Sequence, residues 1–182
     1  AFLEIITNSQ KLRSWFSDAT VNKIEKLVAT QESAKLQAFV RCLREIHKKD
    51  PTAKVVVFTE AISSQMEVLK YLKDKAGYSE SQVAAIMGGT PRAERHDIED
   101  KFSNRSSKLL VLIATDTIAE GKDLQHACHD LIHFELSWSL VKIEQRNGRI
   151  DRLGQKYTPR IHNIVLDTEA TPDQRIIDRL LT

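Results

Sequence analysis

Two arginines and a glutamine are spaced so that they could hold a polyphosphate. In a continuous helix Gln145, Arg149 and Arg152 occupy positions i, i+4 and i+7, which fall within one narrow stripe. Each guanidinium can donate two parallel hydrogen bonds to phosphate oxygens and keeps its charge. A solvated arginine face paired with Glu144 and Asp151 explains the same residues without a ligand, so both interpretations stay open at this point.

Two loops have features that are typical of ligand contacts. Residues 88–92 (GGTPR) follow an expected strand and open an expected helix, where glycines let backbone amides approach a ligand and the helix N-terminus favours phosphate. Residues 114–124 (ATDTIAEGKDL) begin where another strand ends. There Thr115 is suited to touch a phosphate and Asp123 a ribose hydroxyl. The ligand-free alternatives are a plain strand–helix turn and a short capped helix that Gly121 stops.

Apolar runs alternate along the chain with stretches of helical periodicity. The runs predict buried strands at 54–59, 83–87, 109–114, 131–134 and 161–166. The periodic stretches predict helices at 33–48, 62–77, 90–102 and 139–153. Such alternation predicts one α/β domain with a mainly parallel sheet and right-handed crossovers. Ligands of these sheets lie beyond the carboxyl ends of the strands.

Composition sets limits on the class of protein. A chain of 182 residues suits one domain, and its formal charge of +2 is too small to indicate nucleic acid, so any basic patch must be local. Cys42 and Cys128 have no paired spacing, which favours a reducing compartment, and we expect a cytoplasmic protein. No apolar run approaches the ~20 residues that span a bilayer, so no membrane partner is expected. Because the first residue is Ala1, we expect a fragment of a longer protein.

In this order, the segments resemble the second RecA-like domain of superfamily-two helicases and translocases. Residues 54–59 resemble motif IV, and residues 114–124 resemble motif V. Residues 145–152 (QRNGRIDR) fit the motif VI pattern QxxGRxxR at every fixed position. The resemblance covers about residues 33–167.

Two short segments resemble one branch of this superfamily in particular. Residues 136–139 (LSWS) and 152–155 (RLGQ) are similar to the Swi/Snf-type branch, and within it to the bacterial RNA-polymerase-recycling ATPase and related phage-defence translocases. Residues 114–116 (ATD) depart from the glycine-rich motif V of chromatin remodellers and are more like general helicases.

The resemblance implies a RecA-like three-layer sandwich with a mainly parallel central sheet. It divides the chain into a helical or irregular lead-in at 1–32, the helicase C-terminal domain at 33–170 and a helical tail at 171–182. The sequence contains no GxxxxGK[ST] phosphate loop. In this family that loop belongs to the first RecA-like domain. ATP and Mg²⁺ would therefore be bound mainly by that missing domain, and the isolated chain, which we expect to be monomeric, would be inactive alone.

The resemblance also assigns roles to residues near the nucleotide. Arg152 would be the arginine finger that stabilises charge on the transferring phosphoryl group, with Arg149 beside it on the phosphates. Gln145 would position the nucleotide or couple it to the other domain. Gly121 and Asp123 would lie near the ribose.

A second set of residues would face the nucleic-acid backbone, with DNA expected ahead of RNA. These residues are Thr115, Gly89, Thr90 and Arg92. Phosphate contacts of this kind give affinity without sequence preference.

Three alternatives stand beside the motor hypothesis. One is a catalytically silent nucleic-acid-binding or regulatory module with the same fold. Another is a small-molecule α/β domain that binds a phosphate at residues 88–90, which leaves the arginine stripe unexplained. A third is a metal site at His126, Cys128, His129 and His133, but the set matches no standard zinc spacing, so we predict no metal.

Overall fold

The computed structural model describes residues 17–20, 33–116 and 124–165. The chain divides into two compact units, Ala1–Gln37 and Ala38–Thr182. Within the first unit, residues 18–20 form one helical turn. Most of the expected lead-in at 1–32 and the whole of the expected tail at 171–182 lie outside the described residues, so this division of the chain stays a prediction.

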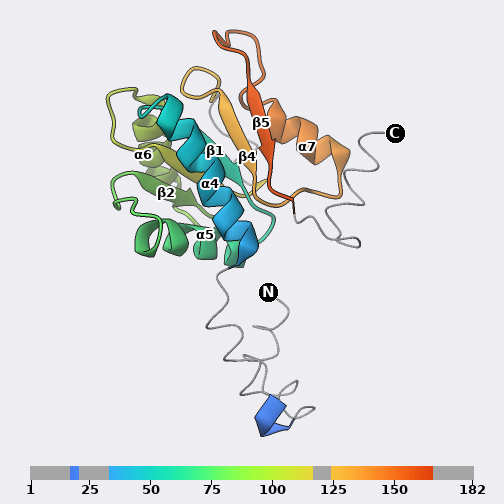
Figure 1. Ribbon diagram of the computed structural model, residues 1–182. Coiled ribbons are helices and arrows are strands. Elements are labelled where there is room, and N and C mark those ends of the chain that lie inside the picture. Colours follow the sequence, from blue (N-terminus) through green and yellow to red (C-terminus); the bar gives the residue numbers. More distant parts are fainter. Residues whose placement is uncertain (1–16, 21–32, 117–123, 166–182) are drawn as a thin grey trace. The chain divides into compact units, whose positions relative to one another are not determined.

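Five strands of the second unit form one sheet in the order β2-β3-β1-β4-β5 (Figure 1). The strands are β1 (Val55–Phe58), β2 (Val83–Ile86), β3 (Val111–Ala114), β4 (Asp130–His133) and β5 (Arg160–Asn163). All four pairings between them are parallel, as the sequence predicts. β1, the first strand among the described residues, is central, because Val55 lies opposite Val111 on one side and Asp130 on the other.

The described helices are α4 (Ala34–Lys49), α5 (Ile62–Asp74), α6 (Arg92–Ser103) and α7 (Leu140–Asn147). α4 precedes β1, whereas α5, α6 and α7 connect β1 to β2, β2 to β3 and β4 to β5, as expected for parallel crossovers. In Figure 1, α4 crosses in front of the sheet. The sequence predicts the type and order of all these elements, and most boundaries agree within a few residues.

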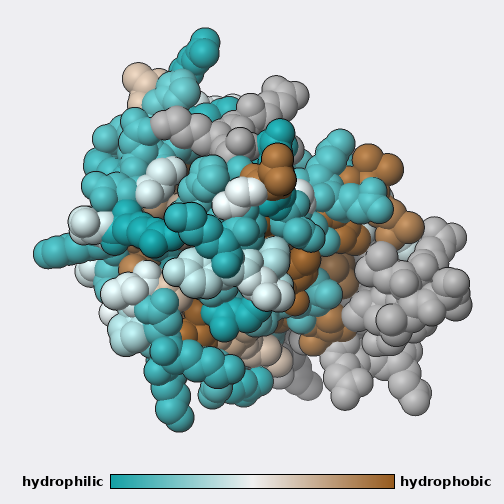
Figure 2. Space-filling model, turned by 90° about the horizontal axis from the view of Figure 1, so that it is seen from above, coloured by the Kyte–Doolittle hydropathy of each residue, from teal (hydrophilic) through white to brown (hydrophobic). Residues whose placement is uncertain are grey.

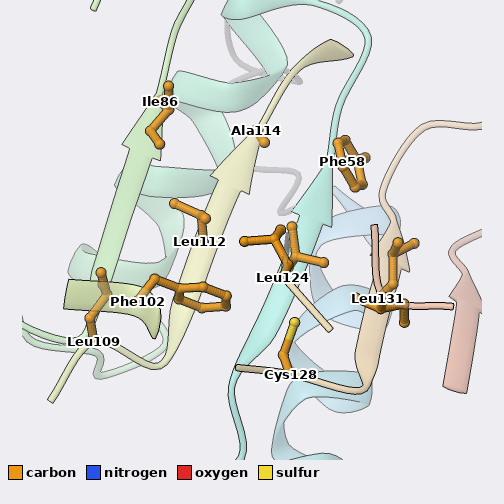
Figure 3. Close-up of a cluster of buried hydrophobic side chains, with 11 residues drawn as sticks. Phe58, Ile86, Phe102, Leu109, Leu112, Ala114, Leu124, Cys128 and Leu131 are labelled. Atoms are coloured by element: carbon orange, nitrogen blue, oxygen red, sulfur yellow. The ribbon is translucent and has the colours of Figure 1, made fainter. Parts of the chain in front are cut away.

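Short β-branched runs form the strands because both faces of a parallel sheet are covered. All four residues of β1 are fully buried, whereas residues of the edge strand β5 alternate between half-buried and exposed. One face of the sheet carries a continuous apolar cluster, to which α6 and the segments after β3 and α7 contribute (Figure 3). Its buried members are Val56, Phe58, Ile86, Phe102, Leu109, Leu112, Ala114, Leu124, Cys128, Leu131 and Ile150.

One helix boundary differs clearly from the prediction. A helix was expected to continue to residue 153, but α7 ends at Asn147, with Gly148 as its C-cap. Glycine is a weak helix former. In addition, the backbone N–H of Leu124 donates to the carbonyl of Arg149 at 3.2 Å, which takes the acceptor that a longer helix would use. Local propensity and a tertiary hydrogen bond therefore both stop the helix here.

Candidate functional site

The carboxyl ends of the three central strands bring charged residues together. Phe58 pairs in register with Ala114 and with His133, so the strands β1, β3 and β4 end side by side. Carboxylates follow each of these ends within two residues, at Glu60, Asp116 and Glu135. This edge of a parallel sheet is where ligands usually bind.

Arg146 of α7 lies at the centre of these carboxylates and is only 1% exposed. Its Nε donates to Asp116 Oδ1 at 2.6 Å, its Nη1 to the carbonyl of Glu135 at 3.0 Å, and its Nη2 to Glu60 Oε1. The guanidinium carbon also lies 5.4 Å from the centre of the Phe58 ring. One buried cation therefore connects the loops that follow β1, β3 and β4.

The charge of Arg146 is balanced by groups that still reach water. Asp116 is 30% exposed and also accepts a hydrogen bond from Lys142 at 3.0 Å. Burial alone would raise the pKa of Asp116, but hydrogen bonds from Arg146 and Lys142 outweigh it and lower the pKa. The carboxylate therefore stays ionised and holds the arginine in place.

Glu135 fastens the start of α5 to the same cluster. Its carboxylate accepts hydrogen bonds from the backbone N–H of Glu60 and from the hydroxyl of Ser64, both at 2.8 Å. The segments after β1 and β4 are thus joined by side chains as well as by Arg146. The cluster works as a rigid base for the loops around it.

A neutral histidine lies beneath the cluster. His133 is fully buried, and its Nε2 shares a 2.9 Å hydrogen bond with the side-chain oxygen of Asn147. Burial lowers the pKa of His133 to about 4, although the bond to Asn147 opposes this shift. With the amide oxygen as acceptor, the neutral ring carries its proton on Nε2. The residue therefore contributes a hydrogen bond to α7, not a charge.

The end of α7 changes how the predicted catalytic residues are arranged. Gln145 is exposed on the helix, whereas Arg149 lies half-buried in the turn after it and Arg152 is exposed in the following segment. The three residues are therefore not one stripe of a continuous helix. Ile150 is buried as expected, but Leu153, which was expected to pack against the sheet, is 97% exposed.

Gly148 lies close to its own helix. A Cβ at this position would approach the carbonyl oxygen of Glu144 to 3.2 Å. The sequence suggested a tight approach here, and the close atom belongs to the preceding turn of α7. The glycine thus lets the chain leave the helix and place Arg149 near Leu124.

The predicted nucleic-acid residues lie in two loops at the carboxyl edge. Gly89 is exposed between β2 and α6, and Arg92 is exposed at the first position of α6; a Cβ at Gly89 would meet no atom within 4 Å. The hydroxyl of Thr90 accepts a hydrogen bond from the backbone N–H of Met87 at 2.9 Å, so it shapes the turn. Thr115 is buried directly after β3.

Two predicted ribose contacts, Gly121 and Asp123, lie outside the described residues, as does most of the expected short helix between them and Thr115. The described chain resumes at Leu124, whose backbone hydrogen bond to Arg149 joins it to the turn after α7.

The histidines considered as metal ligands have other surroundings. Nε2 of His129 lies 3.2 Å from Arg160 Nη2, and His133 contacts Asn147. Within residues 17–20, 33–116 and 124–165, no three His, Cys, Asp or Glu side chains are grouped to hold a metal ion. In the same ranges, none of the helices has both the length and the apolar character needed to cross a membrane.

Sequence reasoning missed Arg146, Glu60 and Glu135. Arg146 stands beside the motif positions and received no role from the sequence, although its side chain is the most buried of the three arginines in residues 145–152. One signal was available: acidic residues directly follow three strands whose ends meet at one edge. Such a set of carboxylates requires a cation, and α7 begins at the same edge.

Comparison with known proteins gives a consistent family match. Residues 34–154 match the family described as the helicase conserved C-terminal domain. The chain is 34% identical over 151 residues to the uncharacterized ATP-dependent helicase YqhH of Bacillus subtilis, which covers 83% of this chain and 24% of that protein. It is 31% identical to the human DNA repair and recombination protein RAD54B, over 86% of this chain and 16% of that protein.

Another curated relative is the RNA polymerase-associated protein RapA of Vibrio campbellii, 29% identical over 68% of this chain and 12% of that protein. The chain thus spans about a quarter or less of the length of these curated relatives.

Solved structures show the same fold. The Pyrococcus furiosus Hef helicase domain superposes with a TM-score of 0.68 at 19% identity, over 98% of this chain and 36% of that chain. The C-terminal part of the Fun30 ATPase domain gives a TM-score of 0.63 at 16% identity, over 97% of this chain and 62% of that chain. The expected RecA-like architecture with its parallel sheet is confirmed by these likenesses.

Proposed function

The chain belongs to the family of helicase conserved C-terminal domains of superfamily two, and on that premise we propose that it is the C-terminal motor domain of a nucleic-acid-dependent ATPase. In this proposal ATP and Mg²⁺ bind in a cleft that is completed by a first RecA-like domain of the same polypeptide. This chain contributes arginines to that cleft and loops to the nucleic acid.

The different burial of three arginines is the observation that supports this proposal most. Arg146 is buried and donates hydrogen bonds to three loops of its own domain. Arg152 is exposed, and Arg149 is half-buried in the turn that contacts Leu124. A fixed arginine beside an exposed one suits a domain that presents a guanidinium group to a ligand from across a cleft.

The residues around this turn fit a polyphosphate better than a metal ion. Gln145 and Arg152 offer exposed amide and guanidinium donors, which match phosphate oxygens. Bound ATP supplies the phosphoryl group to be transferred. Arg152 would donate hydrogen bonds to its oxygens, Arg149 would neutralise neighbouring charge, and Gln145 would orient the nucleotide. Mg²⁺ would be held by the first domain.

We place the nucleic-acid backbone against the loops at residues 88–92 and 114–116. Arg92 is exposed at the start of α6, and open space surrounds Gly89. The loop that carries Thr115 and Asp116 is anchored through Arg146 to the helix that carries Gln145. Arg146 is thus a positioning residue through which a nucleic-acid contact and the nucleotide contacts can influence each other. Since RAD54B is named for DNA repair and recombination, we favour DNA over RNA as the track.

The proposal is tested on the polypeptide that carries both RecA-like domains. ATP hydrolysis is measured without nucleic acid and with duplex DNA, single-stranded DNA or RNA. Arg152→Ala is expected to lower the stimulated kcat by about 10³-fold or more while nucleotide still binds, as loss of an arginine finger does. The control is Arg41→Ala, an exposed arginine of α4, which should leave turnover unchanged.

Two results would contradict the proposal. Unchanged turnover in Arg152→Ala would remove the arginine-finger assignment and favour a catalytically silent module. Turnover that none of the nucleic acids stimulates would remove the motor assignment. The nucleic acid that stimulates most identifies the track.

A further inference from the structure

A cavity lies at the amino-terminal ends of the strands, on the edge opposite the Arg146 cluster. It has a volume of about 530 Å³ and is lined by the segments before β1 and β4, by the segment before β5 and by Arg105. The strands β1 and β5 begin at the upper edge in Figure 1, and Figure 2 looks down on that edge, where hydrophilic side chains predominate. Neither the nucleotide contacts nor the nucleic-acid contacts proposed above use this cavity.

Cationic side chains dominate the lining. They are Lys49, Lys54, Arg105, Lys156 and Arg160, of which Arg160 is paired with Asp130 at 2.6 Å, so that four cations face the one carboxylate in the lining, that of Asp50. Asp50 already accepts hydrogen bonds from the backbone N–H and the hydroxyl of Thr52, at 2.9 and 2.7 Å. The cavity therefore has an excess of positive charge that its own carboxylate does not balance.

Lys54 is the unusual member of this set because its side chain is only 4% exposed. Its ammonium donates to the carbonyl of Leu109 at 2.8 Å and, at 3.5 Å, to that of Lys101. It lies 5.4 Å from the centre of the Phe102 ring, and no carboxylate forms an ion pair with it among the described residues. Burial lowers the pKa of Lys54. A buried ammonium without a counter-ion is costly, and an anion in the cavity would remove that cost.

Gln125 is a second buried polar residue, and its side chain has an unused hydrogen-bonding atom. The residue is 5% exposed and lines the cavity, and its side-chain oxygen is buried without a hydrogen-bond partner. Buried polar atoms normally have partners. As placed, this oxygen can only accept a hydrogen bond; with the amide turned over, the NH₂ group takes its place and can donate to a phosphate oxygen.

We propose that this cavity binds a small phosphorylated anion, with Lys54 as the buried counter-charge and Gln125 as a hydrogen-bonding group. Arg105 and Lys156 are exposed and add positive charge. The shared chemistry is the phosphate group, which either pyrophosphate and free nucleotides or a nucleic-acid strand can provide. Tyr157 and His129 contribute aromatic rings, with centroids 5.1 Å apart, on which a base can stack.

The test measures binding of inorganic pyrophosphate to the 182-residue chain by calorimetry at low ionic strength. Lys54→Met is expected to weaken binding at least about 30-fold, because it removes one partner of a buried charge pair. Arg105→Ala should weaken it several-fold, since that charge is exposed. The matched control is Lys70→Met, which changes an exposed lysine of α5 outside the cavity.

Competition separates the two sources of phosphate. Displacement of pyrophosphate by ADP, with the same loss in Lys54→Met, identifies a free nucleotide, whereas displacement by short single-stranded DNA identifies a strand. No saturable pyrophosphate binding by the wild-type chain would overturn the proposal. Equal affinities of Lys54→Met and Lys70→Met would also overturn it. Because Arg105→Ala changes a surface residue, it remains informative if Lys54→Met fails to fold.

Discussion

The two edges of the sheet carry ionic clusters of opposite design. At the carboxyl edge a buried cation, Arg146, is 1% exposed and is held by acidic neighbours. At the amino edge a fully buried carboxylate, Asp130, is held by Arg160 at 2.6 Å and by His162 at 3.1 Å. Each cluster thus has one charge removed from water, surrounded by partners of the other sign.

In each cluster the central charge is buried, whereas its partners are partly exposed, and this difference decides how much each residue contributes to stability. The partners Glu60 and Asp116 are 36% and 30% exposed, and Arg160 is 40% exposed. If the central charge is lost, water can hydrate these partners. If a partner is lost, water cannot reach the buried central charge to take the partner's place. Partly exposed residues can therefore matter more for stability than their exposure suggests.

The largest expected effect is from Asp116→Ala, which leaves the Arg146 guanidinium with only Glu60 as a carboxylate partner. Breaking a buried pair this way should lower the free energy of unfolding by about 3 kcal/mol. Urea unfolding of the chain gives the measurement. The control is Asp97→Ala, whose partner Lys101 lies 2.5 Å away with both side chains more than half exposed, so that its loss should cost at most about 0.5 kcal/mol. Equal losses in the two variants would show that water replaces Asp116.

Arg160→Met should have a smaller effect, about 2 kcal/mol, because Asp130 keeps its hydrogen bond to His162. The same unfolding measurement applies, with Arg41→Met on the surface of α4 as the control. A loss greater than that in Asp116→Ala would reverse the ranking of the two edges. The amino edge would then hold the more tightly coupled cluster.

The amino edge should also make stability depend on pH. The hydrogen bond to Asp130, followed by that to Cys42, raises the pKa of His162 from 6.5 to about 9. The folded state therefore holds this proton more tightly than the unfolded state. Its contribution is complete below pH 6.5 and is lost as the pH rises through about 9. Urea unfolding across this range should show the decline, and His162→Gln should flatten it. A variant with an unchanged slope would assign the dependence to another group.

The fold was predictable because its signals are local. Residues 55–58 (VVVF) and 111–114 (VLIA) are short, apolar and rich in β-branched residues, which favours buried strands, and Asp50-Pro51 favours the end of a helix. The end of α7 was not predictable to the same degree. Residues 148–153 keep helical periodicity, but the acceptor that a longer helix needs is taken by Leu124, which is distant in the sequence.

The sequence predicted the motif residues of the candidate site but not the residues that hold them in place. The pattern QxxGRxxR gives Gln145, Arg149 and Arg152, yet it leaves Arg146 as an arbitrary position. Arg146 is held by Glu60 and Asp116, which lie close together because β1 and β3 pair in the sheet. Sequence spacing within one helix contains none of that information.

The central position of β1 has a consequence for folding. During synthesis this strand leaves the ribosome before any of its partners, because it pairs with β3 and β4 and not with β2, the next strand of the chain. Its four apolar residues therefore keep both hydrogen-bonding edges open until residue 114 has been made. Non-local parallel pairing is slow and exposes the chain to aggregation. A nascent chain that stalls between β2 and β3 would be a substrate for chaperones. Once β4 has left the ribosome, β3 and β4 can pair with β1 on both of its edges.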